Sequence, residues 1–379
     1  MQPGRVFWSR SIASRERDPG ASSSCCALGS PESFQRLPPI SVLQHLKPGM
    51  ASKVQGAALA FRKTFTFPSK DLTRWYPQHM YTGMKDMQRK LKSVDCILEL
   101  HDARVPFSGR NPNFSSRLTA VKPHVLLLNK MDMAHSKYDD VVISQLKSEG
   151  ISNVLYIKST QPHKNIGKIV PLVTDLIKKS DRYNRREAYD YNIMIIGIPN
   201  VGKSSLINAL RHKYLQIKGQ ATRVGALAGV TKSVLMKIKI SEDPLIYLLD
   251  TPGIMTPSAQ DAEVGLKLAL CGNMNDNLVG VELMADYLLY WLNKNGNYSY
   301  TDYLGLEEPC DDIRLVLYKT AVALRATLKV RTYEGLAVKP DLDAAATHFV
   351  LGFRQGIFGR VVLDVDKLQL TEQSCVESC

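Results

Sequence analysis

The chain lacks the features of membrane-spanning proteins and of cysteine-stabilised proteins. None of its apolar runs approaches the ~18 consecutive residues that a membrane-spanning helix requires, so any membrane contact is expected to be peripheral. The seven cysteines include no Cys-x-x-Cys pair, and their number is odd. This usage argues against a disulfide framework or a zinc site and favours a reducing compartment.

Acidic residues are scarce at the front of the chain. Residues 1–70 hold 10 Lys and Arg against 3 Asp and Glu, residues 71–257 hold 28 against 16, and residues 258–379 hold 11 against 17. The net charge is +13. A basic front and a mildly acidic tail indicate a polyanionic partner such as RNA. A merely solvated basic surface would explain the charge equally well.

Residues 1–70 are expected to be a leader that is disordered or removed. The first 49 residues are rich in Ser, Pro, Gly and Arg, and no acidic residue occurs from Ser33 to Lys70. Apolar residues 58, 59, 61 and 65 could share one side of a basic helix. This pattern favours a mitochondrial transit peptide, with a generic basic leader as the alternative. Met50 could serve as an alternative start.

Short apolar segments and helical patterns alternate between residues 94 and 249. Strands are expected at residues 94–100, 125–128, 154–157, 193–196, 235–240 and 245–249, and helices at 141–146, 166–177 and from 204. This alternation predicts a mostly parallel sheet covered on both faces, which is the α/β class. We assign residues 71–257 to this domain.

Only helical spacing follows from about residue 258. Helices are expected at residues 262–270, 281–292, 313–328 and 342–353. Asp311 or Asp312 is a suitable N-cap for the third. We therefore expect a smaller, mostly helical C-terminal domain at residues 258–379.

The strongest motif is Gly197-Ile-Pro-Asn-Val-Gly-Lys-Ser204, which fits G-x-x-x-x-G-K-[ST] between a strand and a helix. Backbone N–H groups and the helix N-terminus would cradle phosphates. Lys203 would neutralise the β- and γ-phosphates, and Ser204 would bind magnesium. The predicted phosphate-binding residues are Asn200, Val201, Gly202, Lys203, Ser204 and Ser205.

A second motif, Asn129-Lys130-Met131-Asp132, ends a strand. The Asp132 carboxylate can accept two hydrogen bonds from N1–H and the exocyclic amine of guanine, a donor pair that adenine lacks. This favours GTP over the alternative of an ATPase or nucleoside kinase. Lys158 and Ser159 are weaker candidates for guanine contacts, because they could equally form an ordinary turn.

A third motif, Asp250-Thr-Pro-Gly253, follows an apolar strand. Asp250 would hold magnesium, and the Gly253 N–H would sense the γ-phosphate. Thr231 has the position of a switch threonine that binds magnesium, although a lone Thr is often only a polar loop residue.

The order of these motifs is unusual, because the base-reading motif precedes the phosphate loop, whereas Ras-like proteins have the reverse order. This order resembles that of the circularly permuted GTPases, and within them the ribosome biogenesis GTPase A family with its mitochondrial members. The resemblance covers residues 71–365 and includes Trp75–Met80, Asp102–Pro106, Gly265–Leu270 and Ala285–Leu289. It implies a P-loop GTPase three-layer fold with circularly permuted motif order. This chain departs from the family at two positions: Gln78 stands where the family usually has Gly, and Ala228 where it usually has Pro.

The group that orients the attacking water is not evident. Many GTPases place Gln directly after D-x-x-G, but here Ile254 stands there, so slow intrinsic hydrolysis is expected. The resemblance implies that Asn200 lets a potassium ion bridge the phosphates and that His79 assists hydrolysis. Alternatively, Asn200 only shapes the loop and His79 is structural. The predicted catalytic residues are His79, Lys203, Thr231 and Gly253.

The resemblance also implies partners and a location. We expect a monomeric GTP-hydrolysing switch with Mg²⁺ as cofactor and K⁺ as a second candidate. Its partner would be the mitochondrial large ribosomal subunit, both rRNA and proteins. Its location would be the mitochondrial matrix, with at most peripheral contact on the matrix side of the inner membrane. The alternatives are a cytosolic or nucleolar assembly GTPase and an rRNA-binding scaffold with little turnover.

Overall fold

The computed structural model describes residues 61–67, 89–110, 122–160, 165–182, 185–217, 236–251, 253, 262–333 and 335–369. The chain divides into two units, Met1–Leu59 and Ala60–Cys379. The first unit, which carries most of the expected leader, lies outside the described residues.

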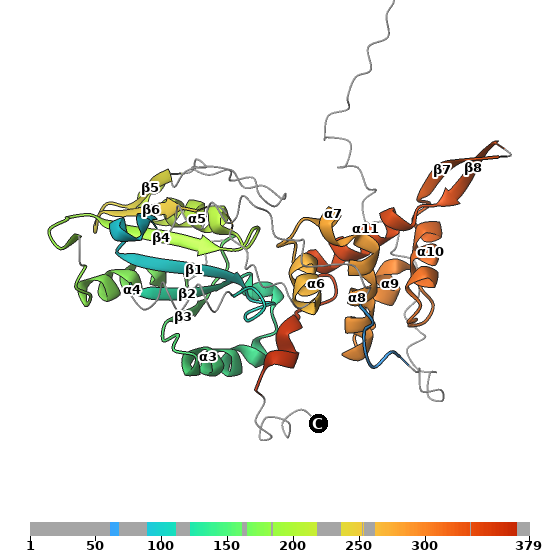
Figure 1. The fold of residues 1–379 in the computed structure, drawn as a ribbon, viewed down its shortest axis with the longest axis horizontal. Coiled ribbons are helices and arrows are strands. Elements are labelled where there is room, and N and C mark those ends of the chain that lie inside the picture. The colour runs from blue at the N-terminus through green and yellow to red at the C-terminus, as the bar shows by residue number, and fades with distance from the viewer. Residues whose placement is uncertain are drawn as a thin grey trace, which may run out of the picture. The chain divides into compact units, whose positions relative to one another are not determined.

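A six-stranded sheet forms the centre of residues 89–251 (Figure 1). The strand order is β3-β2-β1-β4-β6-β5, and every neighbouring pair is parallel except β5 with β6. Its strands are β1 (Cys96–Asp102), β2 (His124–Asn129), β3 (Val154–Tyr156), β4 (Tyr191–Gly197), β5 (Met236–Ser241) and β6 (Ile246–Asp250). Every residue of β1 is buried, as expected of a central strand covered on both faces.

Helices cover both faces of this sheet, which confirms the α/β three-layer prediction. Helices α4 (Ile166–Lys178) and α5 (Lys203–Leu215) pack in one core with Leu98. Helix α3 (Asp139–Ser148) packs against Leu126 on the opposite face. The buried residues of α4 recur at helical spacing, so the helix presents one apolar side to the sheet; they are Ile166, Ile169, Val170, Val173 and Ile177.

The sheet topology gathers the predicted motifs at one edge. Strand β1 pairs with β2 on one side and with β4 on the other, so the chain order reverses there. Because β1, β2, β4 and β6 are parallel, their last residues lie along the same edge: Asp102, Asn129, Gly197 and Asp250. In open α/β sheets, ligands bind beyond the carboxyl ends of strands at such a reversal.

A buried carboxylate, that of Glu99, lies within the central strand β1. Glu99 Oε1 lies 2.8 Å from His101 Nε2, and Glu99 Oε2 lies 2.8 Å from His124 Nε2. Burial alone would raise the pKa of Glu99, but the hydrogen bonds to both histidines outweigh it and hold the pKa well below its usual range. This cluster joins β1 to the start of β2.

Residues 262–369 are mostly helical. The helices are α6 (Ala262–Leu270), α7 (Asp276–Val279), α8 (Val281–Lys294), α9 (Tyr300–Leu304), α10 (Ile313–Ala323) and α11 (Leu342–Arg354). Of the two N-cap candidates, Asp312 is confirmed, because its carboxylate accepts hydrogen bonds from Arg314 N and Leu315 N.

The prediction of a helix through residue 328 was wrong. Helix α10 ends at Ala323, and Arg325 has a left-handed φ of 54°. An antiparallel hairpin follows, formed by β7 (Thr327–Thr332) and β8 (Gly335–Pro340). Three of the six residues of β7 are β-branched, namely Thr327, Val330 and Thr332, and this composition favours a strand over the helix that the apolar spacing indicated.

Residues 61–67, assigned to the leader by sequence, contact the helical region. Arg62 binds Asp286 at 2.8 Å and Asp311 at 3.0 Å. The ring of Phe65 meets that of Tyr287 edge-on, with centroids 5.3 Å apart. This short segment therefore lies against α8.

Candidate guanine-nucleotide site

Asn129 joins the base-reading motif to the phosphate loop. Its Nδ2 donates to Val201 O at 2.7 Å and to Ser159 Oγ at 2.9 Å, while its Oδ1 accepts from Ser159 N at 3.0 Å. Asn129 is only 1% exposed. Segments 129–132, 158–159 and 197–204, which are far apart in sequence, thus meet around one amide side chain.

Backbone geometry permits this close approach. A Cβ on Gly202 would lie 2.4 Å from Asn129 Nδ2, so only glycine fits there, and its φ of 101° also favours glycine. Directly after β2, Lys130 adopts a left-handed φ of 60° and leads into the short 3₁₀ helix η5 (Met131–Met133). The turn after β2 therefore places Asp132 in η5, just beyond the carboxyl end of the strand.

The phosphate loop holds its lysine in a buried position. Lys203 begins α5 and donates from Nζ to Gly197 O at 3.0 Å and to Ile198 O at 2.9 Å. Burial lowers the pKa of Lys203 to about 8, although the negative charge of Asp250 partly opposes the shift. Ser204 and Ser205 follow in the first turn of α5, where helix N–H groups favour an anion.

The third motif lies against the phosphate loop. Thr251 Oγ1 donates to Ile195 O at 2.6 Å, which fixes the end of β6 beside β4. A Cβ on Gly253 would lie 2.8 Å from Pro199 N, so this glycine contacts the loop backbone. The three predicted motifs therefore meet at the same sheet edge.

Asp250 has the properties of a magnesium ligand. Among the described residues, its buried Oδ1 has no hydrogen-bond partner. Burial raises the pKa of Asp250, and the Lys203 ammonium only partly opposes that rise. A buried carboxylate with an unpaired oxygen next to a phosphate cradle fits a hard divalent cation, which prefers oxygen ligands. This observation supports the magnesium expected there.

The base-reading end carries an ion pair. Lys158 Nζ lies 3.0 Å from Asp132 Oδ2, and both side chains are partly exposed, at 22% and 36%. Lys158 and Ser159 follow β3 directly. The pair places Lys158 where it can orient the Asp132 carboxylate.

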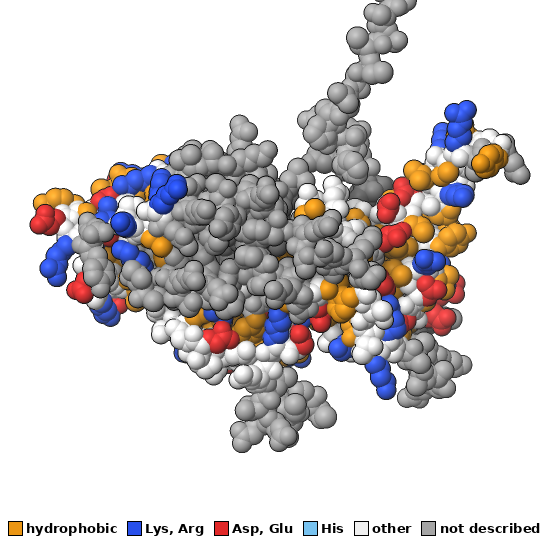
Figure 2. Space-filling model, in the orientation of Figure 1, with side chains coloured by type: hydrophobic (Ala, Val, Ile, Leu, Met, Phe, Trp, Pro, Cys, Tyr) orange, Lys and Arg blue, Asp and Glu red, His pale blue; other side chains and the backbone are white. Residues whose placement is uncertain are grey.

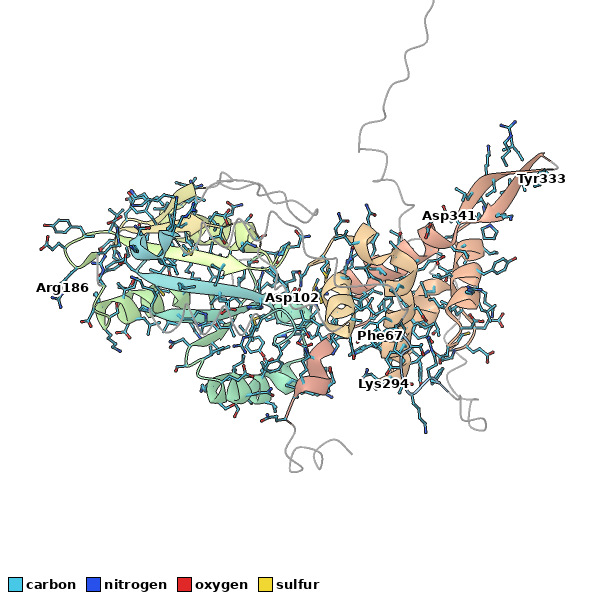
Figure 3. All side chains as sticks on the ribbon, in the orientation of Figure 1. Phe67, Asp102, Arg186, Lys294, Tyr333 and Asp341 are labelled. Atoms are coloured by element: carbon cyan, nitrogen blue, oxygen red, sulfur yellow. The ribbon has the colours of Figure 1, made fainter. Side chains whose placement is uncertain are left out.

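Two buried residues near the site were not among the predicted site residues. Asp102 ends β1 (Figure 3). Its carboxylate accepts two hydrogen bonds from the Arg104 side chain, of 3.0 and 2.8 Å, and lies 2.9 Å from Lys130 Nζ. Burial would raise the pKa of Asp102, but these two cations hold it well below its usual range. A polar Asp-Ala-Arg segment directly after a buried strand was the signal available in the sequence.

The same region contacts the helices that follow. Arg104 Nη2 donates to Cys271 O at 3.4 Å, and Asn200 Nδ2 donates to Gly272 O at 2.8 Å. The guanidinium of Arg104 also lies over the ring of Phe353, 5.4 Å from its centroid. The turn after α6 is therefore hydrogen-bonded both to the phosphate loop, through Asn200, and to Arg104, the ion-pair partner of Asp102.

Known proteins share this sequence over most of its length. Residues 192–307 match a family model described as 50S ribosome-binding GTPase. The chain is 51% identical over 313 residues to "Mitochondrial GTPase 1" of Aedes aegypti, covering 81% of this chain and 98% of the relative. It is 48% identical over 314 residues to "Mitochondrial ribosome-associated GTPase 1" of Bos taurus, covering 82% and 94%.

The chain belongs to the mitochondrial GTPase 1 family. It is a circularly permuted GTPase that hydrolyses GTP to GDP and phosphate, as its motif order predicted. Among solved structures, the GNP-bound YlqF from T. maritima aligns with a TM-score of 0.46 and 22% identity, covering 75% of this chain and 96% of that chain.

Two predicted catalytic residues, His79 and Thr231, lie outside the described residues, as does Ile254. Their roles therefore stay predictions. The other predicted site residues of this GTPase lie at the sheet edge formed by the ends of β2, β3, β4 and β6.

Proposed function

We propose that this GTPase is a switch that binds the mitochondrial large ribosomal subunit and drives or checks its assembly, thereby regulating mitochondrial translation. The bovine relative is named as ribosome-associated, and the matching family model is described as 50S ribosome-binding. The observation that carries the proposal is the bonding of Asn200 and Arg104 to the turn after α6. Through it, a change at the nucleotide can reach the helical region.

The nucleotide-binding roles follow from the arrangement of the three motifs. Asp132 would accept two hydrogen bonds from guanine, with Asn129 holding the motif in place and Lys130, Met131, Lys158 and Ser159 completing the base end. The backbone of residues 200–205 would surround the phosphates, and Lys203 would leave its carbonyl partners for the β- and γ-phosphates. A positive charge on Lys203 is favoured once phosphate lies beside it.

Magnesium, when bound, would neutralise charge on the β- and γ-phosphate oxygens. Asp250, Ser204 and Thr231 would hold it. Gly253 lies on the backbone of Pro199, so its N–H can report the γ-phosphate without a side chain in between. Loss of that contact would free the segment that leads into α6.

Two elements of the hydrolysis step remain to be tested. A potassium ion near the phosphates would be bound by Asn200 Oδ1, and the hydrogen bond from Nδ2 to Gly272 O fixes the orientation of that amide. Equal GTP turnover in potassium and in sodium would remove potassium from the mechanism. His79 is proposed to assist hydrolysis, and a His79→Ala variant with undiminished ribosome-stimulated turnover would remove that role.

We place the protein in the mitochondrial matrix, as a monomer. None of the helices in the described part of the chain is long and apolar enough to cross a membrane. Peripheral contact on the matrix side of the inner membrane is part of the same proposal. A fluorescent fusion of residues 1–70 that stays outside mitochondria would contradict this location and favour a cytosolic or nucleolar role.

The deciding experiment measures phosphate release with and without purified mitochondrial large subunits. Slow release alone and a clear increase on adding subunits are expected, because Ile254 cannot orient water and the partner must complete the site. Binding without any increase in turnover would instead support an rRNA-binding scaffold. Absence of binding would refute the proposed function.

A further inference from the structure

The β7–β8 hairpin has no role in the nucleotide site. It extends beyond α10, away from the other helices (Figure 1). Its base is fixed, because Asp341 N donates to Ala326 O at 3.0 Å and the Asp341 carboxylate caps α11 by accepting from Ala344 N at 2.9 Å. The hairpin is thus an arm that is held at its base and exposed along its length, which leaves both of its faces open to a partner.

Cations and aliphatic side chains face each other across the two strands. The cross-strand pairs include Leu328 with Lys339, Lys329 with Val338, and Arg331 with Leu336. Because side chains alternate between the faces of a strand, the first pair lies on one face and the other two on the opposite face. Both faces of the hairpin therefore present positive charge.

The hairpin cations Lys329, Arg331 and Lys339 are all exposed. Within the described residues, none of Lys329, Arg331 and Lys339 forms an ion pair. Residues 325–339 hold four Lys and Arg against one Glu, whereas residues 258–379 as a whole hold 11 against 17. Figure 2 shows basic and apolar surface together over the hairpin. The positive charge of this otherwise acidic region is concentrated on the arm.

The tip carries an exposed aromatic ring. Tyr333 is fully exposed and lies at the end of the arm (Figure 3). An exposed ring beside cations is the combination that binds unpaired bases, since aromatic faces stack on bases while Lys and Arg contact the phosphates.

We propose that the β7–β8 hairpin is an RNA-binding arm, in which Lys329, Arg331 and Lys339 contact phosphates of large-subunit rRNA and Tyr333 stacks on an unpaired base. This rests on the proposed ribosome binding and names its contact surface. The core of a protein interface is depleted of charged residues, Lys above all, whereas both faces of the hairpin carry cations, which favours RNA over a protein partner. RNA surrounding an inserted arm presents phosphates to both faces.

The test compares two triple variants by their affinity for purified mitochondrial large subunits at several salt concentrations. In the arm variant, Lys329, Arg331 and Lys339 are all replaced by Gln. Each phosphate contact contributes about 0.7 to 0.9 to the slope of log affinity against log salt. Between about 50 and 200 mM salt, wild-type affinity should therefore fall ~20- to ~40-fold more than that of the arm variant.

The control variant removes the same amount of charge from exposed positions on the sheet domain, far in sequence from the hairpin. In it, Lys147, Lys178 and Arg186 are replaced by Gln. It should keep more of the wild-type salt slope than the arm variant does. An equal loss of slope in both triples would show a general charge effect and overturn the arm. Basal GTP turnover should be unchanged in both, because none of the six residues lies at the nucleotide site.

The tip is tested by Tyr333→Ala and Tyr333→Phe. The alanine variant should bind subunits about fivefold to about a hundredfold more weakly, while phenylalanine, which keeps the ring, should bind like wild type. Binding that depends on Leu336→Ser and Val338→Ser but not on the cations would indicate a protein partner and refute the RNA arm. If wild type itself fails to bind subunits, the proposed function fails; if wild type binds and the arm variant binds identically, only the arm fails.

Discussion

Replacing Asn129 with alanine tests whether one side chain holds the two halves of the nucleotide site together. The substitution removes three hydrogen bonds of 2.7, 2.9 and 3.0 Å and leaves Val201 O and Ser159 N without their partner in a buried place. With a net contribution of about 0.5–1.5 kcal/mol for each bond, the free energy of unfolding should fall by about 2–4 kcal/mol. That is a large share of the ~5–15 kcal/mol typical of a folded domain.

The assay is urea unfolding without nucleotide, followed by equilibrium binding of a fluorescent GDP. The Asn129→Ala protein should unfold at lower urea with an unchanged slope, and it should bind GDP more weakly, because the base-reading and phosphate loops are no longer tied together. Ser159→Ala is the matched control. It removes only the 2.9 Å bond to Oγ and should cost about 1 kcal/mol.

The reasoning fails if Asn129→Ala and Ser159→Ala lower stability by the same small amount. That result would mean that Val201 O is satisfied in another way and that the loops are positioned by the sheet alone. Weaker GDP binding with unchanged stability would show that Asn129 contacts the nucleotide but does not join the loops.

Three further predictions concern buried or base-reading carboxylates. Asp102→Asn leaves Arg104 and Lys130 without their shared carboxylate and should destabilise the protein by about 3–5 kcal/mol in thermal or chemical unfolding; a loss under about 1 kcal/mol would mean water replaces it. Glu99→Gln should destabilise most at neutral pH, and the difference in unfolding free energy from wild type should narrow below about pH 4.5, because a lowered pKa gives stability that is lost as Glu99 protonates; a difference that stays constant in urea unfolding from about pH 4.5 down to about pH 2.5 would contradict this. Asp132→Ala should reduce the ratio of GTP to ATP affinity in competition binding by about a hundredfold or more, and an unaltered ratio would show that Asp132 does not read the base.

The sheet and the site edge could be predicted because their signals are local. Each strand is a short apolar run, and each motif stands at the end of one, so parallel pairing alone brings them to one edge. The permuted order of Asn129 and Gly197 does not prevent the two motifs from meeting, because only β1 lies between β2 and β4 in the sheet. The position of each motif depends on which strand it follows in the sheet, whereas the order of the motifs along the chain affects only the segments that connect the strands.

Local patterns point to the segment that holds Asp102 and Arg104, but they predict neither its distant contacts nor the hairpin. The partners of Arg104 include Cys271 O, a backbone atom whose position no residue type reveals. For the hairpin, apolar residues at helical spacing continue past Ala323, and only the left-handed turn at Arg325 ends the helix. Contacts with distant backbone atoms, and a helix end set by one unusual φ, depend on tertiary structure and leave only weak signals in the local sequence.

The permutation ties the helical region to the nucleotide site at both of its ends. At its start, residues 254–261 join Gly253 to α6, and the turn after α6 is bonded to Asn200. At its end, Val361 N donates to Met133 O at 2.9 Å, next to the base-reading motif. In the proposed switch, hydrolysis would change the phosphate side of the site and leave the base in place. In the proposed switch, the second attachment therefore serves as the pivot, and loss of the γ-phosphate would turn the helical region about its base-side anchor rather than release it.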